Sequence, residues 1–212
     1  MRLAHGLRAA AGFPRIGSFY QGGYFAGYIS HNADGVATHG LIVAPAASGY
    51  NDKTLTQWKT SATASAGTQN EYDGAINTAN MNDANHPAAQ YCAGLTINGY
   101  DDWYLPARYE LDIAYQNLKP TTQSNDTSSG VNPYSVPQRA ANRTTSIPTI
   151  TSALSFQVLN SEAFIAGFHY SSTEVVDDTS NAWRINFSNG AHSFGNGKNF
   201  ALQVRAFRKF AV

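Results

Sequence analysis

Segments with strand character lie at both ends of this chain, and segments with helical character lie between them. Near the N-terminus, the aromatic run 23–29 is typical of a strand, the turn residues Asn32-Ala33-Asp34-Gly35 follow, and the apolar run 40–44 predicts the returning strand of a β-hairpin. The tail predicts four further strands, at 168–172, 182–187, 192–194 and 201–208. Because strands flank a helical middle, the chain is predicted to fold as a mixed α+β domain.

Two helical segments are predicted in the middle of the chain. The first covers 71–94 and is interrupted at His86-Pro87, and the second opens at Pro106 and runs to about Leu118. The apolar stripe of the second helix consists of Leu111, Ala114, Tyr115 and Leu118. We therefore expect two helices packed on twisted antiparallel sheets.

A long polar segment separates the second helix from the tail. Residues 119–152 are rich in Thr, Ser, Asn and Pro, and 121–130 contains no apolar residue. A structureless stretch of this length within a compact domain is typically functional or disordered. At the other end, residues 1–18 are rich in Ala, Gly and Arg and are interpreted as an N-terminal arm. Residues 19–212 then form one domain.

Charge and composition exclude several classes of partner. Fourteen Lys and Arg balance fourteen Asp and Glu without a basic cluster, which argues against nucleic acid. The apolar runs are too short to span a membrane, and His5 and Arg8 interrupt the start of the chain, so no signal peptide is expected. The single cysteine, Cys92, rules out an intrachain disulfide and is expected to be a buried hydrophobe. Asn, Ser and Thr (18, 18 and 17 residues), together with 12 Tyr, favour a binding module with a neutral surface.

Three ordered motifs resemble one protein family. Residues 99–111, Gly-Tyr-Asp-Asp-Trp-Tyr-Leu-Pro-Ala-Arg-Tyr-Glu-Leu, resemble a G-Y-x-D-W-x-L-P-x-R-x-E-L signature. Ser-Ser-Thr-Glu at 171–174, Ala182-Trp183 and the final motif 204–208 resemble the rest of its pattern. Over about residues 19–210 the chain is similar to the Lcl C-terminal-like family. This resemblance implies a C-type-lectin-like fold, related to the formylglycine-generating-enzyme fold, in which we expect the 23–29 strand to lie close to the 201–208 strand.

Departures from the family and its relatives limit what the resemblance implies. Tyr170 stands where the family usually has Trp, and the catalytic cysteines of the sulfatase-modifying relatives are absent. The calcium-coordinating Glu-Pro-Asn and Trp-Asn-Asp motifs of sugar-binding lectins are also absent. Neither oxidase chemistry nor calcium-dependent sugar binding is therefore implied. Six motif residues are expected to be framework: Asp102, Trp103, Arg108, Glu110, Trp183 and Arg205. Glu174, which follows a strand, is expected to accept backbone N–H bonds and hold a loop.

The chain matches none of the catalytic templates considered. The six histidines lack zinc-hydrolase spacing, and no Gly-x-Ser-x-Gly motif is present. The pairs Asp101-Asp102 and Asp177-Asp178 are interpreted as turn residues rather than as the paired carboxylates of a glycosidase. We therefore predict that the protein is not an enzyme and needs no metal or cofactor. A calcium ion at Asp177 and Asp178 is the alternative that the sequence leaves open.

A neutral ligand surface is predicted in the tail, formed together with the 119–150 loop. In C-type-lectin-like domains this late region forms much of the ligand face, and here it combines aromatic rings with Asn side chains. The predicted ligand-binding residues are His169, Tyr170, Trp183, Asn186, His192, Asn196, Lys198 and Asn199. For Trp183, a core position is the alternative.

The function expected is that of a phage or prophage virion protein associated with the tail. The segments 22–27 and 41–45 resemble the version of the family that tailed phages carry among their tail genes. Such a protein is made in the host cytoplasm, joins other virion proteins through its N-terminal arm and binds a glycan or protein on the host surface. Homo-oligomer formation stays open. The alternatives are a structural decoration or adaptor protein, a bacterial adhesin, which the missing signal peptide disfavours, and an enzyme.

Overall fold

The described part of the protein, in a computed structural model, is residues 14–212, without the side chains of Asp52 and Lys53. Most of the predicted arm lies outside it. The last two residues of that arm already pair with the domain, because Gly17 N donates to Phe25 O at 2.8 Å and Phe25 N donates to Ser18 O at 3.0 Å.

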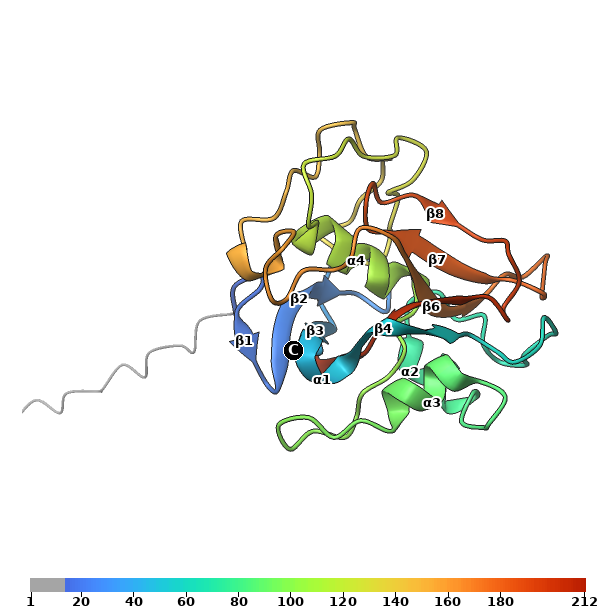
Figure 1. Cartoon of the computed structure of the whole chain (residues 1–212). Coiled ribbons are helices and arrows are strands. Elements are labelled where there is room, and N and C mark those ends of the chain that lie inside the picture. The colour runs from blue at the N-terminus through green and yellow to red at the C-terminus, as the bar shows by residue number, and fades with distance from the viewer. Residues whose placement is uncertain (1–13) are drawn as a thin grey trace, which may run out of the picture.

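Two five-stranded sheets form the frame of the described chain (Figure 1). The first has the order β1-β2-β3-β10, with β5 added on β2: β1 (Phe19–Tyr20), β2 (Gly23–Ile29), β3 (His39–Val43), β10 (Phe207–Ala211) and β5 (Ser135–Val136). The second has the order β4-β9-β6-β7-β8: β4 (Tyr50–Gln57), β9 (Ala201–Arg205), β6 (Phe168–Glu174), β7 (Ala182–Asn186) and β8 (His192–Ser193). Neighbouring strands are antiparallel except β6 and β9, which run parallel.

The C-terminal segment joins the two sheets. The strand predicted at 201–208 is in fact two strands that meet at Ala206, whose N–H donates to Gly49 O and whose carbonyl accepts from Ala44 N, both at 2.9 Å. Because β10 pairs with β3, the 23–29 strand has β3 between it and the C-terminal strand. The two ends of the domain still meet, since the rings of Tyr20 and Phe210 lie 5.3 Å apart.

The helices are shorter and more numerous than predicted. The described chain has four α-helices and one 3-10 turn: α1 (Ala46–Gly49), α2 (Gly74–Ala79), α3 (Pro87–Ala93), α4 (Arg108–Leu118) and η1 (Leu154–Phe156). The predicted break is confirmed, because Pro87 is the first residue of α3. Helix α4 begins two residues after Pro106, where extended Ala107 is the N-cap and its N–H is bound by the side chain of Glu110.

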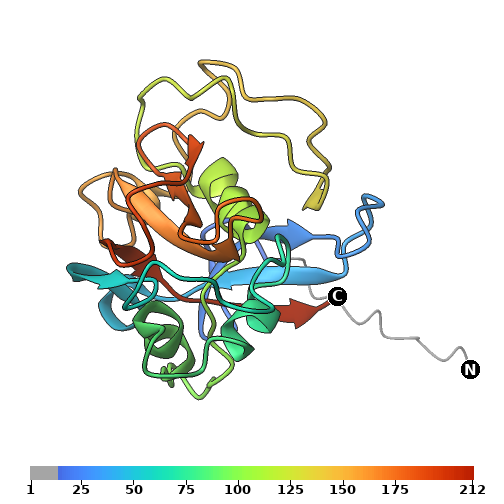
Figure 2. The same ribbon diagram turned by 90° about the vertical axis from the view of Figure 1, so that its right-hand side faces the viewer.

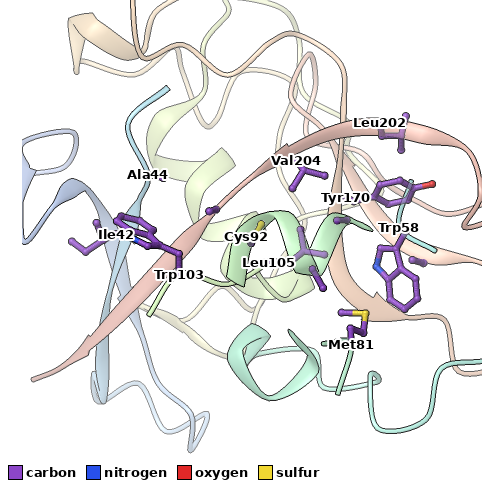
Figure 3. Close-up of a cluster of buried hydrophobic side chains, with 14 of the residues drawn as sticks. Ile42, Ala44, Trp58, Met81, Cys92, Trp103, Leu105, Tyr170, Leu202 and Val204 are labelled. Atoms are coloured by element: carbon purple, nitrogen blue, oxygen red, sulfur yellow. The ribbon is translucent and has the colours of Figure 1, made fainter. Parts of the chain in front are cut away.

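The core lies between the sheets and the helices in two clusters. One, shown in Figure 3, packs the rings of Trp58, Trp103 and Tyr170 with aliphatic residues such as Leu105 and Val204. Cys92 is buried in this cluster as expected, and burial raises the pKa of its thiol. The other cluster contains the predicted stripe of α4, all of it buried. None of the described helices combines the length and apolar character needed to cross a membrane.

The polar segment 119–152 is irregular, as predicted, apart from β5. It forms the long loops at the top of Figures 1 and 2, beyond α4. Buried Lys119 holds its two ends together: Nζ donates to Gln123 O at 2.5 Å, Asn125 Oδ1 at 2.7 Å and Pro148 O at 3.2 Å. The loop therefore has an internal polar anchor in place of secondary structure.

Candidate functional site

A pocket of about 260 Å³ opens where the first turn of α4 meets the polar loop and strands β7 and β8. These elements lie together in the upper part of Figure 1. The pocket is lined by Arg108, Tyr109, Ser128, Ser129, Gly130, Val131, Asn142, Trp183 and His192.

The Ser-Ser-Thr-Glu motif positions the first turn of α4. Ser172 N donates to Pro106 O at 2.7 Å, and Arg108 N donates to Thr173 Oγ1 at 3.0 Å. The same Thr173 hydroxyl donates to Asn70 O at 2.9 Å. Because β6 runs through the middle of its sheet, these bonds hold the backbone of Arg108 against a rigid strand.

Glu110 completes this anchor from inside the helix. Its buried carboxylate accepts from Ala107 N at 2.7 Å, Gly74 N at 3.0 Å and the Tyr104 hydroxyl at 2.7 Å. Burial raises the pKa of Glu110 to about 7, while the bonds from Ala107 and Tyr104 act in the opposite direction. The structure gives Glu110 the framework contacts that its motif predicts.

The side chain of Arg108 forms one wall of the pocket. Its Nη1 pairs with Glu71 Oε1 at 2.8 Å, its Nε donates to His192 Nδ1 at 3.2 Å, and its guanidinium carbon lies 3.7 Å from the centre of a Trp183 ring. The framework interpretation of Arg108 is therefore incomplete. Its backbone belongs to the frame, but its charged group faces the pocket.

His192 is held as a neutral imidazole. Since Nδ1 accepts from Arg108, the proton resides on Nε2, which donates to Asp112 Oδ1 at 2.8 Å. Burial, together with Arg108 and two further arginines, keeps the pKa of His192 well below its usual range. Both ring nitrogens are occupied, so in this arrangement His192 serves to position its neighbours and does not present a free base.

Buried Asp112 joins α4 to the polar loop. Its carboxylate forms ion pairs with Arg139 and Arg143 and accepts from Asn132 Nδ2 at 2.9 Å. Arg143 also donates to Gly190 O at 2.8 Å, which ties the loop to the β7–β8 turn. One carboxylate therefore fixes both walls of the pocket.

A second set of bonds fixes the edge of the loop that faces the pocket. His192 N donates to Ser129 Oγ at 3.0 Å, and Ser128 Oγ donates to Asp126 at 2.9 Å. Asp126 N in turn donates to Asn189 O at 2.8 Å. The 126–130 segment is thus held to the β7–β8 hairpin from both sides.

Of the eight predicted ligand-binding residues, Trp183 and His192 line the pocket. Trp183 is partly exposed rather than buried in the core, and the edge-to-face ring of Phe194 lies 5.1 Å from it. Asn186 is half-buried in the β7–β8 turn, where its Oδ1 accepts from Ser188 N at 2.9 Å. Asn196 and Asn199 are exposed on the following loop, outside the pocket lining.

The three other predicted residues are buried, which corrects their assignment to a ligand face. His169 is 1% exposed and lies among the rings of Tyr50, Phe164 and Phe187. The Tyr170 hydroxyl donates inward to Phe200 O at 2.9 Å. Lys198 is 0% exposed because Nζ pairs with Glu174.

The contact between Lys198 and Glu174 also shows what the Glu174 carboxylate does in the fold. This carboxylate accepts from Ser65 N at 2.6 Å as well as from Lys198, so it holds a loop through a backbone N–H as predicted.

Several lining residues carry no clear signal in the sequence. Ser128, Ser129 and Gly130 belong to the 121–130 stretch, which has no apolar residue. The length of the polar segment around this stretch is the one indication in the sequence that it has a functional role. Tyr109 lies within a motif interpreted as framework. Nothing in the sequence distinguishes Asn142 from the other asparagines.

The acidic and histidine side chains of residues 14–212 are not grouped as metal ligands. Within this range, no group of three or more His, Cys, Asp or Glu side chains is arranged to hold a metal ion. At the position considered for calcium, Asp178 accepts from Ser180 Oγ at 2.5 Å and Asn181 Nδ2 at 2.7 Å, the hydrogen bonds of a turn.

The chain matches a known protein family over most of its length. A family model described as the Lcl C-terminal domain matches residues 50–208, which include every residue that lines the pocket. No curated protein matches the chain.

Proposed function

Since the chain belongs to the Lcl C-terminal domain family, we propose that it is a binding module of a phage or prophage virion. In this proposal the protein is associated with the tail and recognises a glycan or protein on the host surface. The pocket between Arg108, Trp183 and the polar loop is its binding site.

The observation that carries the proposal is a fixed pocket with unused polar groups. Asn142, Tyr109 and Trp183 are among its lining residues, and the polar groups of their side chains form no hydrogen bond with another described residue. Buried ion pairs at Asp112 hold the walls in place, so little ordering is needed when a ligand binds.

A C-type-lectin-like fold is part of the proposal. Its support is the family membership, the sheet in which β2, β3 and β10 bring the two ends of the domain together, and the long loop beside β7 and β8. The virion assignment rests on the resemblance of 22–27 and 41–45 to phage versions of the family. Attachment through the N-terminal arm concerns residues that lie mostly outside the described chain.

A structural adaptor in the virion is the second candidate, favoured by a nearly uncharged segment that exposes several apolar side chains. Between residues 144 and 168 the one charged side chain is Glu162, which is buried against Arg205. The same stretch exposes five aliphatic side chains, with Leu159 98% exposed: Ile147, Leu154, Val158, Leu159 and Ile165. Exposed aliphatic side chains in a segment with so little charge suit contact with a protein partner.

Binding of the full chain to intact host cells tests the first candidate. We expect Trp183→Ala to weaken cell binding by about 2 kcal/mol or more, because binding energy concentrates in a few aromatic or arginine side chains. Asn142→Ala should weaken it less, and Asn82→Ala, which removes an exposed amide outside the pocket lining, should leave it unchanged. Thermal melting of each variant is the control, and losses of binding that only follow losses of stability would contradict the proposal.

The adaptor candidate is tested in purified particles. Mass spectrometry and electron microscopy locate the protein, and Leu159→Asp introduces a charge at the most exposed aliphatic position of the 144–168 segment. If the protein is an adaptor, this variant should fold normally and be lost from particles. Unchanged incorporation together with pocket-dependent cell binding favours the receptor-binding function.

A further inference from the structure

The lining of the pocket carries no net charge once its contacts are counted. Arg108 is the one charged lining residue within the described chain, and Glu71 compensates it at 2.8 Å. His192 is neutral, because its pKa is held low and both ring nitrogens are hydrogen-bonded. The remaining lining residues are uncharged.

The charges behind the lining are balanced as well. Arg139 and Arg143 both pair with Asp112, and Asp126 interacts electrostatically with Arg143. Together with the Arg108–Glu71 pair, the surroundings of the pocket contain three guanidinium groups and three carboxylates, so their charges cancel. Lys119, a further cation nearby, lines a different pocket and donates to neutral oxygens. An anionic ligand would therefore gain little net attraction here.

The unused polar groups match ligand groups that both donate and accept hydrogen bonds. The Asn142 side chain offers an amide oxygen and an NH₂, the Tyr109 hydroxyl can act in either direction, and Trp183 Nε1 donates. Alcohol hydroxyls are complementary to such a mixture. The rings of Tyr109 and Trp183, both of which contact the Arg108 guanidinium, add apolar area to the lining.

The size of the pocket limits the ligand further. Its volume of about 260 Å³ lies just below the roughly 300–1,000 Å³ of pockets that enclose drug-sized ligands. A single sugar ring fits this space, whereas a longer oligosaccharide would have to extend out of it.

We propose that this pocket binds one neutral sugar unit, such as a hexose or N-acetylhexosamine, through its hydroxyl groups. The inference rests on the proposed function for the choice of site, and it deepens that function by naming a neutral saccharide as the ligand. Recognition then depends on Asn142, Tyr109 and Trp183 rather than on attraction between opposite charges.

Saturation-transfer NMR on the full chain tests this inference. The neutral probes are glucose, galactose, mannose and N-acetylglucosamine, and the acidic probes are glucuronate, galacturonate and N-acetylneuraminate, each at low and at high salt. We expect at least one neutral sugar to bind with an affinity that does not change with salt. Tyr109→Phe and Asn142→Ala should each weaken binding about three- to tenfold, and Asn82→Ala should leave it unchanged.

Three results would overturn the inference: binding of acidic sugars alone with a steep salt dependence, neutral sugar binding that neither variant alters, or no sugar binding at all. Cell binding separates this failure from failure of the proposed function. If the chain binds host cells but no neutral sugar, the ligand class is wrong and the proposed function stands. If a neutral sugar binds in the pocket and cells are not bound, the proposed host receptor is wrong and the ligand class stands.

Discussion

Asp112→Asn is expected to lower the free energy of unfolding by about 3–5 kcal/mol, the usual cost of removing one partner from a buried ion pair. Asp112 is 0% exposed and is paired with both Arg139 and Arg143. An asparagine has nearly the same shape, but it leaves two guanidinium groups without their counter-charge, and its NH₂ group faces their donors. Urea unfolding followed by circular dichroism measures the change.

The matched control is Asp102→Asn, which removes the same charge from a more exposed pair. Asp102 contacts Arg208 at 2.6 and 2.9 Å, yet its side chain is 51% exposed. Arg208 is itself buried, but it keeps its hydrogen bonds to Gln21 and the exposed amide oxygen of the variant can still accept from it, so the expected cost is smaller, about 1–2 kcal/mol. Similar costs for the two variants would show that Asp112 is not the anchor that joins α4 to the polar loop.

The parts of the fold that the sequence predicts are those where local signals agree with tertiary packing. The Asp34-Gly35 turn and its flanking apolar runs describe the β2–β3 hairpin, and the stripe from Leu111 to Leu118 describes the buried face of α4. In both cases neighbouring residues contain the information, so no distant partner has to be known.

The missed elements depend on distant partners. Strand β4 begins Tyr-Asn-Asp-Lys, which is typical of a turn, and it becomes a strand because Tyr50 and Asn51 pair with Arg205 and Val204 of β9. The division of the C-terminal segment at Ala206 likewise follows from Gly49 and Ala44, which bind its backbone. These contacts cross about 155 residues of chain, and no local pattern reveals them.

The sequence predicts only part of the candidate site, and the reason is again that distant contacts decide which residues are buried. Trp183 and His192 combine suitable chemistry with a turn-rich region, and both line the pocket. His169 and Tyr170 have equally suitable side chains, but they belong to β6, which has β9 on one side and β7 on the other. The polar residues of this strand are satisfied by internal partners such as Asn70 and Asn77, so their polarity does not indicate exposure.

The second large expected effect is a loss of stability in acid, and it arises from the buried side chain of His169. Burial, reinforced by Arg205, lowers the pKa of His169 to about 3, although its hydrogen bond with Gly167 acts in the opposite direction. The Tyr50 hydroxyl donates to Nε2 at 2.6 Å, and Nδ1 bonds to Gly167 O at 3.1 Å, which suits the neutral ring. In the unfolded chain a histidine has a pKa near 6.5.

The direction of this pH dependence follows from the number of protons that the folded and the unfolded states bind. Between pH 6.5 and about 3 the unfolded chain binds a proton at His169 and the folded protein does not, so acidification favours unfolding throughout this window. Stability from this group is complete well above pH 6.5 and falls by about 3 kcal/mol between pH 7 and pH 4.5. Glu110, whose pKa is raised to about 7, opposes this change because its folded form takes up a proton in the same range.

A comparison with His169→Gln isolates the histidine from Glu110, which both proteins share. The variant is expected to be less stable at neutral pH, because the glutamine does not replace the ring packed against Phe164 and Phe187. Between pH 7 and pH 4.5, however, the wild-type protein should lose about 3 kcal/mol more unfolding free energy than the variant does. Urea unfolding at both pH values gives this difference, and NMR titration of the His169 ring checks its origin. Parallel pH dependence of the two proteins, with a ring that titrates near pH 6.5, would mean that His169 is solvated in the folded state and that the β6 strand is less enclosed than its contacts indicate.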